Sequence, residues 1–119
     1  MIRGRGTNYP AGDCQERMPT SPIRKAKILY LSSEKPSALA VEKALGDAFD
    51  YKVGYMGVVN GLYHSLVRID FDEASPVVIS NTLQRLVDAL GIREYTISVY
   101  YTNGSVRSFI NRTPSPGEL

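Results

Sequence analysis

Two Asn-Gly pairs, each flanked by β-branched and aromatic residues, constrain this chain more than any other feature. The first pair, Asn60-Gly61, separates residues 51–59 from 62–71, and the second, Asn103-Gly104, separates residues 95–101 from 105–110. Both residues of such a pair tolerate the positive φ of a type I′ turn, so the pattern predicts two β-hairpins with two-residue loops. That loop length fixes which side chains share a face.

With this register, both hairpins are apolar or aromatic on both faces. In the first hairpin, one predicted face carries Met56, Val58, Tyr63, Val67 and Ile69. Its opposite face carries Val53, Tyr55, Val59, Leu62, His64, Leu66 and Arg68. In the second hairpin, the predicted faces are Tyr95, Ile97, Val99, Tyr101, Val106 and Ile110 against Thr96, Ser98, Tyr100, Arg107 and Phe109. An antiparallel sheet usually buries one face and wets the other, so we expect something to cover the second face.

Signals around the hairpins predict one further strand and two helices. Residues 26–32 have the apolar run of a buried strand. A first helix is expected to begin through Ser33, with Pro36 in its first turn and an apolar stripe that runs to Phe49. A second helix is expected to begin at Ser75-Pro76, an N-cap followed by a proline at the first helical position, and to stop at Gly91.

The predicted order is therefore β-α-β-β-α-β-β, in which an α-β-β unit occurs twice. Right-handed crossovers convert this order into an α+β, ferredoxin-like plait, an antiparallel sheet with both helices on one face and an extra C-terminal edge strand. We expect a single domain over residues 25–112. Residues 1–24 are expected to form an extended or disordered basic arm, and the proline-rich residues 113–119 a flexible tail.

Composition excludes several classes of protein. A chain of 119 residues can bury roughly two-thirds of its unfolded surface and fold without a metal or disulfide. A net charge of +2 is too small to indicate nucleic-acid binding by itself. The lone Cys14 cannot form an internal disulfide, which favours a reducing compartment or indifference to redox state. Without a membrane-length apolar run or a signal peptide, the expected location is cytoplasmic, with no membrane partner.

No sequence motif indicates an active site. Zinc-ligand spacings, P-loops and the glycine patterns of dinucleotide enzymes and hydrolases do not occur, so we predict no catalytic residue, no metal and no cofactor. His64 is the only histidine, and its alternatives are an acid or base and a surface or interface residue. Asp70, Asp72 and Glu73 are either solvated or ligands of a hard cation.

The helix-free face suggests a ligand site, because aromatic and basic side chains together can stack bases and hold phosphates. The predicted ligand-binding residues are Tyr55, His64, Arg68, Tyr100, Arg107 and Phe109. Leu29-Tyr30-Leu31 resembles the first three positions of the short motif of RNA-recognition-motif domains, which also run β-α-β-β-α-β. That family's longer motif does not occur in residues 63–68.

A second resemblance is to the tautomerase superfamily. Residues 86–106, including Leu90-Gly91-Ile92 and Val99-Tyr100-Tyr101, are similar in style to the C-terminal half of those trimers. The resemblance implies an isomerase. Considered from the residues themselves, the enzyme alternative is a small isomerase or lyase with His64 as acid or base in an intersubunit cleft, beside a second titratable group such as Asp70 or Tyr55. The catalytic N-terminal proline of that family has no counterpart at the first predicted strand.

The leading hypothesis is a non-enzymatic, homo-oligomeric assembly or binding module, a dimer or trimer, of the kind found among accessory proteins of viruses and mobile elements. Its predicted interface is the helix-free sheet face, through the aliphatic residues Val53, Val59, Leu62 and Leu66. The alternatives are binding of RNA or a nucleotide-like ligand, and the isomerase activity. The arm, with Arg3 and Arg5, is expected to run across a neighbouring subunit or partner.

Overall fold

The computed structural model describes residues 22–72 and 74–119. Along the chain, the strands and helices follow one another in the predicted order. They are β2 (Ile23–Ser32), α1 (Ala38–Leu45), β3 (Asp50–Val59), β4 (Leu62–Asp70), α2 (Pro76–Leu90), β5 (Tyr95–Tyr101), β6 (Val106–Ile110) and a 3₁₀ turn, η1 (Pro116–Glu118). The predicted arm lies outside the described residues, apart from its last three positions.

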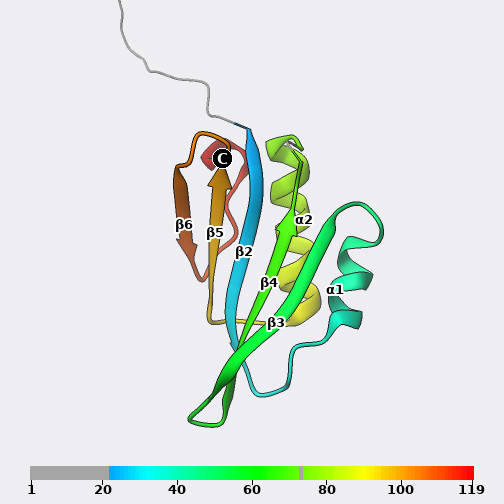
Figure 1. Ribbon diagram of the computed structural model, residues 1–119, viewed down its shortest axis with the longest axis vertical. Helices are drawn as coiled ribbons and strands as arrows, with labels where there is room; N and C mark the ends of the chain where they lie inside the picture. The colour runs from blue at the N-terminus through cyan, green and yellow to red at the C-terminus, as the bar shows by residue number, and fades with distance from the viewer. Residues whose placement is uncertain (1–21, 73) are drawn as a thin grey trace, which may run out of the picture.

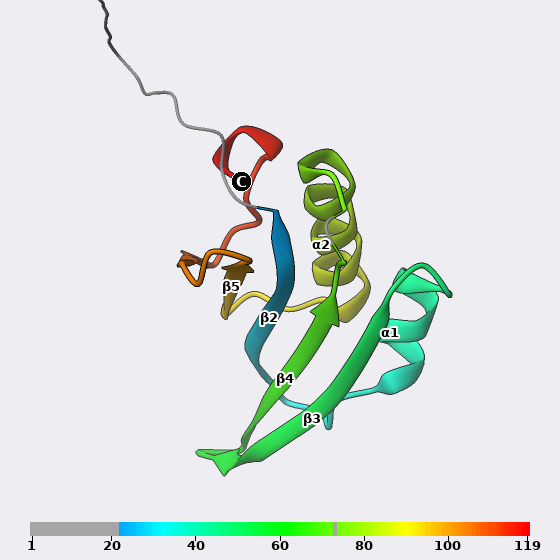
Figure 2. The same cartoon turned by 45° about the horizontal axis from the view of Figure 1, so that its top comes forward.

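The strands form one five-stranded antiparallel sheet in the order β3-β4-β2-β5-β6. Both described α-helices cover the same face of that sheet (Figure 1). The expected α+β ferredoxin-like plait, with β6 as the extra edge strand, is therefore confirmed. The hairpin of β3 and β4 extends beyond the helical layer at its tip (Figure 2).

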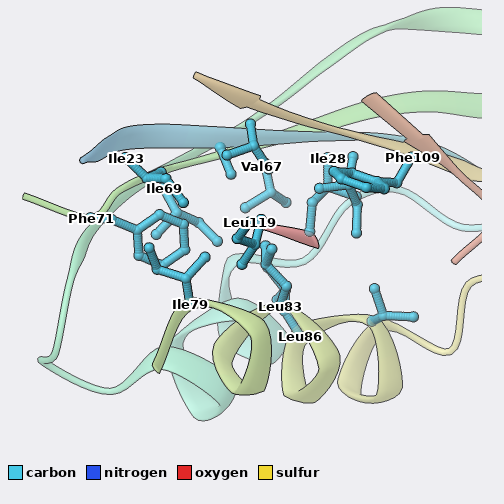
Figure 3. Close-up of a cluster of buried hydrophobic side chains, with 14 of the residues drawn as sticks. Ile23, Ile28, Val67, Ile69, Phe71, Ile79, Leu83, Leu86, Phe109 and Leu119 are labelled. Atoms are coloured by element: carbon cyan, nitrogen blue, oxygen red, sulfur yellow. The ribbon is translucent and has the colours of Figure 1, made fainter. Parts of the chain in front are cut away.

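The hydrophobic core lies between the sheet and the helices (Figure 3). The central strands supply Ala26, Ile28 and Val67, and α2 supplies Ile79, Leu83 and Leu86, all fully buried. These α2 positions recur at helical spacing, which places one apolar stripe against the sheet. Of the helices in the described residues, none has the length and apolar character needed to cross a membrane.

The local signals for α2 are confirmed, whereas those for α1 were placed too early. Ser75 caps α2 by accepting the Val78 amide at 3.3 Å, and Gly91 closes it in the left-handed conformation. The cap of α1 is Ser37, not Ser33, and it accepts the Ala40 amide at 3.4 Å. The helix therefore begins after Pro36, and it ends at Gly46, ahead of Phe49.

A bulge at Met56 corrects the predicted faces of the first hairpin. The two-residue Asn60-Gly61 loop is present, with Val59 opposite Leu62. Beyond it, Tyr55 pairs with Ser65 and Gly57 with His64, so one residue of β3 has no partner. The extra residue reverses the alternation, and Val53 and Tyr55 consequently share the helix-covered face of β4 instead of the opposite face.

A three-residue loop corrects the second hairpin. The Tyr101 amide bonds to the Ser105 carbonyl at 3.0 Å and the Gly104 amide to the Tyr101 carbonyl at 3.0 Å, so the loop spans residues 102–104. Gly104 has a φ of 91°, as a type I turn with a bulge requires. The register shifts by one, and Phe109 lies opposite Ile97 in the core, 4% exposed. Val106 and Ile110 move to the free face.

Both domain boundaries also differ from expectation. Ile23, assigned to the arm, begins β2 and is buried. The tail expected at residues 113–119 packs on the core, with Pro114 and Leu119 both buried. Ser80 Oγ donates to the Pro114 carbonyl at 2.8 Å. This proline-containing segment forms no strand, as predicted. It forms η1, which packs beside α2.

Candidate functional site: the helix-free face of the sheet

The sheet face opposite the helices, called the free face below, has an apolar half toward the β3–β4 tip. The strand pairings place side chains from β2, β3, β4 and β6 together there. This apolar half consists of Leu29, Leu31, Met56, Val59, Leu62, Leu66 and Ile110. Such a group of aliphatic side chains on one open surface is typical of an interaction site.

A hollow of about 440 Å³ lies within this half. Its lining includes Leu29, Leu31, Met56, His64, Thr96 and Ile110. Met56 and Ile110 are 68% and 71% exposed. The thioether of Met56 and the methyl groups of Ile110 are therefore in contact with water.

The other half of the free face is polar and mainly basic. Lys52, Arg68 and Lys27 lie side by side in one row across β3, β4 and β2. Arg68 reaches Asp70 in the next row at 3.6 Å. In that next row Lys25 lies opposite Tyr100, and the ammonium groups of Lys25 and Lys27 are 5.1 Å and 5.2 Å from the centre of the Tyr100 ring.

Six of the predicted site and interface residues lie on the free face. They are His64, Arg68 and Tyr100 from the ligand set and Val59, Leu62 and Leu66 from the interface set. His64 lines the hollow within the apolar half, and Arg68 and Tyr100 belong to the polar half. The predicted ligand set is therefore split between two chemically different regions.

The other four predicted residues lie on the helix side of the sheet. Val53 packs against the core, and Tyr55 contacts Tyr63 at 5.9 Å between ring centres. Phe109 is a core residue, and Arg107 donates to the Glu118 carbonyl at 2.6 Å. A stacking surface made of Tyr55, Tyr100 and Phe109 is thus not formed.

The acid and base that the isomerase hypothesis requires do not lie close together. Asp70 lies six residues beyond His64 on β4, about 20 Å along an extended strand, and Tyr55 is on the other face. The carboxylate that lines the hollow with His64 is Glu94, which the sequence did not single out. Among residues 22–72 and 74–119, no group of histidine, cysteine and acidic side chains is arranged to hold a metal.

Tyr30, central to the resemblance with RNA-recognition motifs, points into the core and is 4% exposed. Burial raises the pKa of its phenol, against an opposing effect of Ser65, its cross-strand partner. A base therefore cannot stack on this ring. On β2, the side chains offered to a ligand are instead Lys25, Lys27, Leu29 and Leu31.

Sequence reasoning missed these alternate residues of β2, together with Lys52 and Ile110. The signal for β2 was the alternation of Lys25, Lys27 and Leu29 with the buried Ala26, Ile28 and Tyr30, which indicates one open face. Comparison with protein-family models, curated proteins and solved structures finds no match. The geometry of the free face is therefore the basis for inferring a function.

Proposed function

We propose that this protein is a non-enzymatic assembly module that associates with a second copy of itself through the apolar half of the free face. The observation that carries the proposal is the exposed aliphatic rim of the hollow, above all Met56 and Ile110. Surfaces of this composition in small domains are stabilised by removal from water.

The free energy gained by burying these side chains supports association of moderate strength. Full burial of a large aliphatic side chain contributes about 1.5–3 kcal/mol, and Leu29, Met56, Val59 and Ile110 are each about half exposed or more. Two copies together therefore gain on the order of 10 kcal/mol, which is comparable to the ~4–15 kcal/mol lost in translational and rotational freedom. With a cost near the lower end of that range, about 6 kcal/mol remains, which corresponds to a dissociation constant of tens of micromolar.

Charge favours one arrangement of the two copies. In a dimer whose two-fold axis runs along β2, the two free faces overlap completely. Lys27 then faces Lys27 of the other copy, which is a repulsive contact. A two-fold axis across the strands at the Leu31–His64 pair avoids this contact. In this second arrangement, Leu62 of one copy lies over Leu66 of the other, and Val59 lies over Gly54, which has no side chain. The basic rows of the two copies then lie at opposite outer ends of the dimer.

The test is the molar mass of the protein in sedimentation experiments over a dilution series from roughly 1 to 100 μM. The wild type is expected to change from dimer to monomer across this range. Met56→Asp and Ile110→Asp are expected to be monomeric throughout, because each places a carboxylate in the interface. Both side chains are mostly exposed, so their thermal unfolding is expected to match that of the wild type.

The matched control is Leu39→Asp, on α1 in the helical layer. Leu39 is 60% exposed, and this substitution is expected to leave the dimer intact. A wild type that is monomeric at the highest concentration overturns the proposal. If Leu39→Asp dissociates the dimer equally, the interface lies on the helices, and the proposal is overturned as well.

A further inference from the structure

The polar half of the free face carries a continuous path of positive charge that the assembly proposal does not use. Lys52 pairs across the sheet with Arg68, and Arg68 with Lys27. Adjacent strands are about 4.8 Å apart, so the three cations span roughly 10 Å. In residues 22–72 and 74–119, only Arg68 of these three forms an ion pair, at 3.6 Å.

An aromatic ring lies at the end of this path. Tyr100 is half-buried in β5, one row beyond Lys27, with the Lys25 and Lys27 ammonium groups 5.1 Å and 5.2 Å from its ring centre. Contacts at this range are cation–π interactions, in which the two ammonium groups lie over the ring. Positive charge and an aromatic ring therefore meet at this end of the path.

The acidic residues of the same face define the direction of the path. Asp50 and Asp70 occupy the row of Lys25 and Tyr100, but on β3 and β4. A chain of negative charges that crosses the sheet is therefore repelled from this corner. Its favourable course runs from Lys52 over Arg68 to Lys27 and ends at Tyr100.

We propose that this path binds single-stranded nucleic acid, with phosphates along Lys52, Arg68 and Lys27 and a base stacked on Tyr100. Cationic side chains combined with an aromatic ring recur in proteins that bind single strands with little sequence preference. An acidic peptide has the negative charge to bind along the same row, but it has no base to stack on the Tyr100 ring. The site is independent of the dimer, since its residues lie outside the apolar half.

The experiment is a fluorescence-anisotropy titration of the full chain with labelled oligo(U) and oligo(dT) of about 12 nucleotides, at several salt concentrations. Three phosphate contacts predict that the logarithm of the binding constant falls with the logarithm of salt concentration with a slope of about −2. Lys27→Ala is expected to reduce that slope by about 0.7. Tyr100→Leu is expected to weaken binding about tenfold at unchanged slope.

Lys43→Ala, on α1 in the helical layer, removes the same charge elsewhere and is expected to leave affinity and slope unchanged. The monomeric variant Met56→Asp is expected to retain binding, which separates this proposal from the assembly. Binding that is undetectable, independent of salt, or equally reduced by Lys43→Ala overturns the proposal. Full competition by polyglutamate of equal charge, with no effect of Tyr100→Leu, assigns the path to acidic peptides and also overturns it.

Discussion

Arg112 and Glu118 form a two-pronged ion pair, with both nitrogen–oxygen distances at 2.7 Å. The same Glu118 carboxylate accepts the Ser115 amide at 2.9 Å. The guanidinium of Arg112 lies 5.0 Å from the centre of the Phe109 ring. This ion pair links the C-terminal segment to the edge of the sheet, next to the end of β6.

The pH dependence of stability is expected to report this pair. The hydrogen bonds from Arg112 lower the pKa of Glu118 to about 2, below its usual 4.5. A carboxylate whose pKa is lowered by folding contributes stability above its unfolded pKa and loses it as the pH falls toward its folded pKa. Glu118→Gln is therefore expected to be less stable than the wild type at pH 7, with the difference vanishing between pH 4.5 and about 2.

Urea unfolding followed by circular dichroism at several pH values measures this difference. Glu34→Gln is the matched control, because Glu34 is exposed and forms no ion pair within the described residues. A wild-type advantage over Glu118→Gln that persists unchanged at pH 2 contradicts the prediction.

Two glycines of β3 are expected to respond oppositely to alanine. Gly57, beside the bulge, has a φ of 137°, which an alanine adopts only with strain, although no atom lies within 4 Å of an added Cβ. Gly57→Ala is expected to destabilise by about 1–3 kcal/mol. Gly54 has equal space and no positive φ, so Gly54→Ala is expected to stabilise by about 0.4–1 kcal/mol. Chemical denaturation measures both, and a common sign for the two would contradict the bulged backbone.

Neighbouring residues of β6 test the register of the second hairpin. Phe109 lies in the core and Ile110 on the free face. Phe109→Ala is expected to cost about 3–5 kcal/mol of unfolding free energy. Ile110→Ala is expected to change it by less than about 0.5 kcal/mol when measured at low protein concentration. The reverse order of the two effects would indicate a two-residue Asn103-Gly104 loop.

The C-terminal residue is expected to act as part of the core. Leu119 is buried, and its carbonyl accepts the Tyr101 hydroxyl at 3.3 Å. Leu119→Ala is expected to lower the free energy of unfolding by about 2 kcal/mol. Val77→Ala, at an exposed position of α2, is the control and is expected to change it by less than about 0.5 kcal/mol. Equal stability of the two variants would mean that residues 113–119 contribute no packing energy.

The order of elements was predictable because its signals are local and strong. Asn60-Gly61 supplied the first turn, Ser75-Pro76 the start of α2 and Gly91 its end. Each of these residues acts through its own backbone preference, which does not depend on the rest of the fold. The plait then followed from the order and from the handedness of the crossovers.

The composition of the free face was less predictable, because it depends on the phase of each strand. One unpaired residue at Met56 moved Val53 and Tyr55 to the core side, and one extra loop residue did the same to Phe109 and Arg107. Neither shift has a signal in side-chain pattern, since both hairpins are apolar on both faces. The C-terminal segment was missed because Leu119 is its only large apolar residue.

The bulge at Met56 also bears on how this protein can diversify. Before it, Tyr51 and Val53 of β3 pack against the core, whereas the tip of the hairpin extends past the helices (Figure 2). The tip at residues 58–62 can therefore vary in length and sequence at little thermodynamic cost to the rest of the fold. Homologous sequences are expected to differ most at this tip, while the core stays constant.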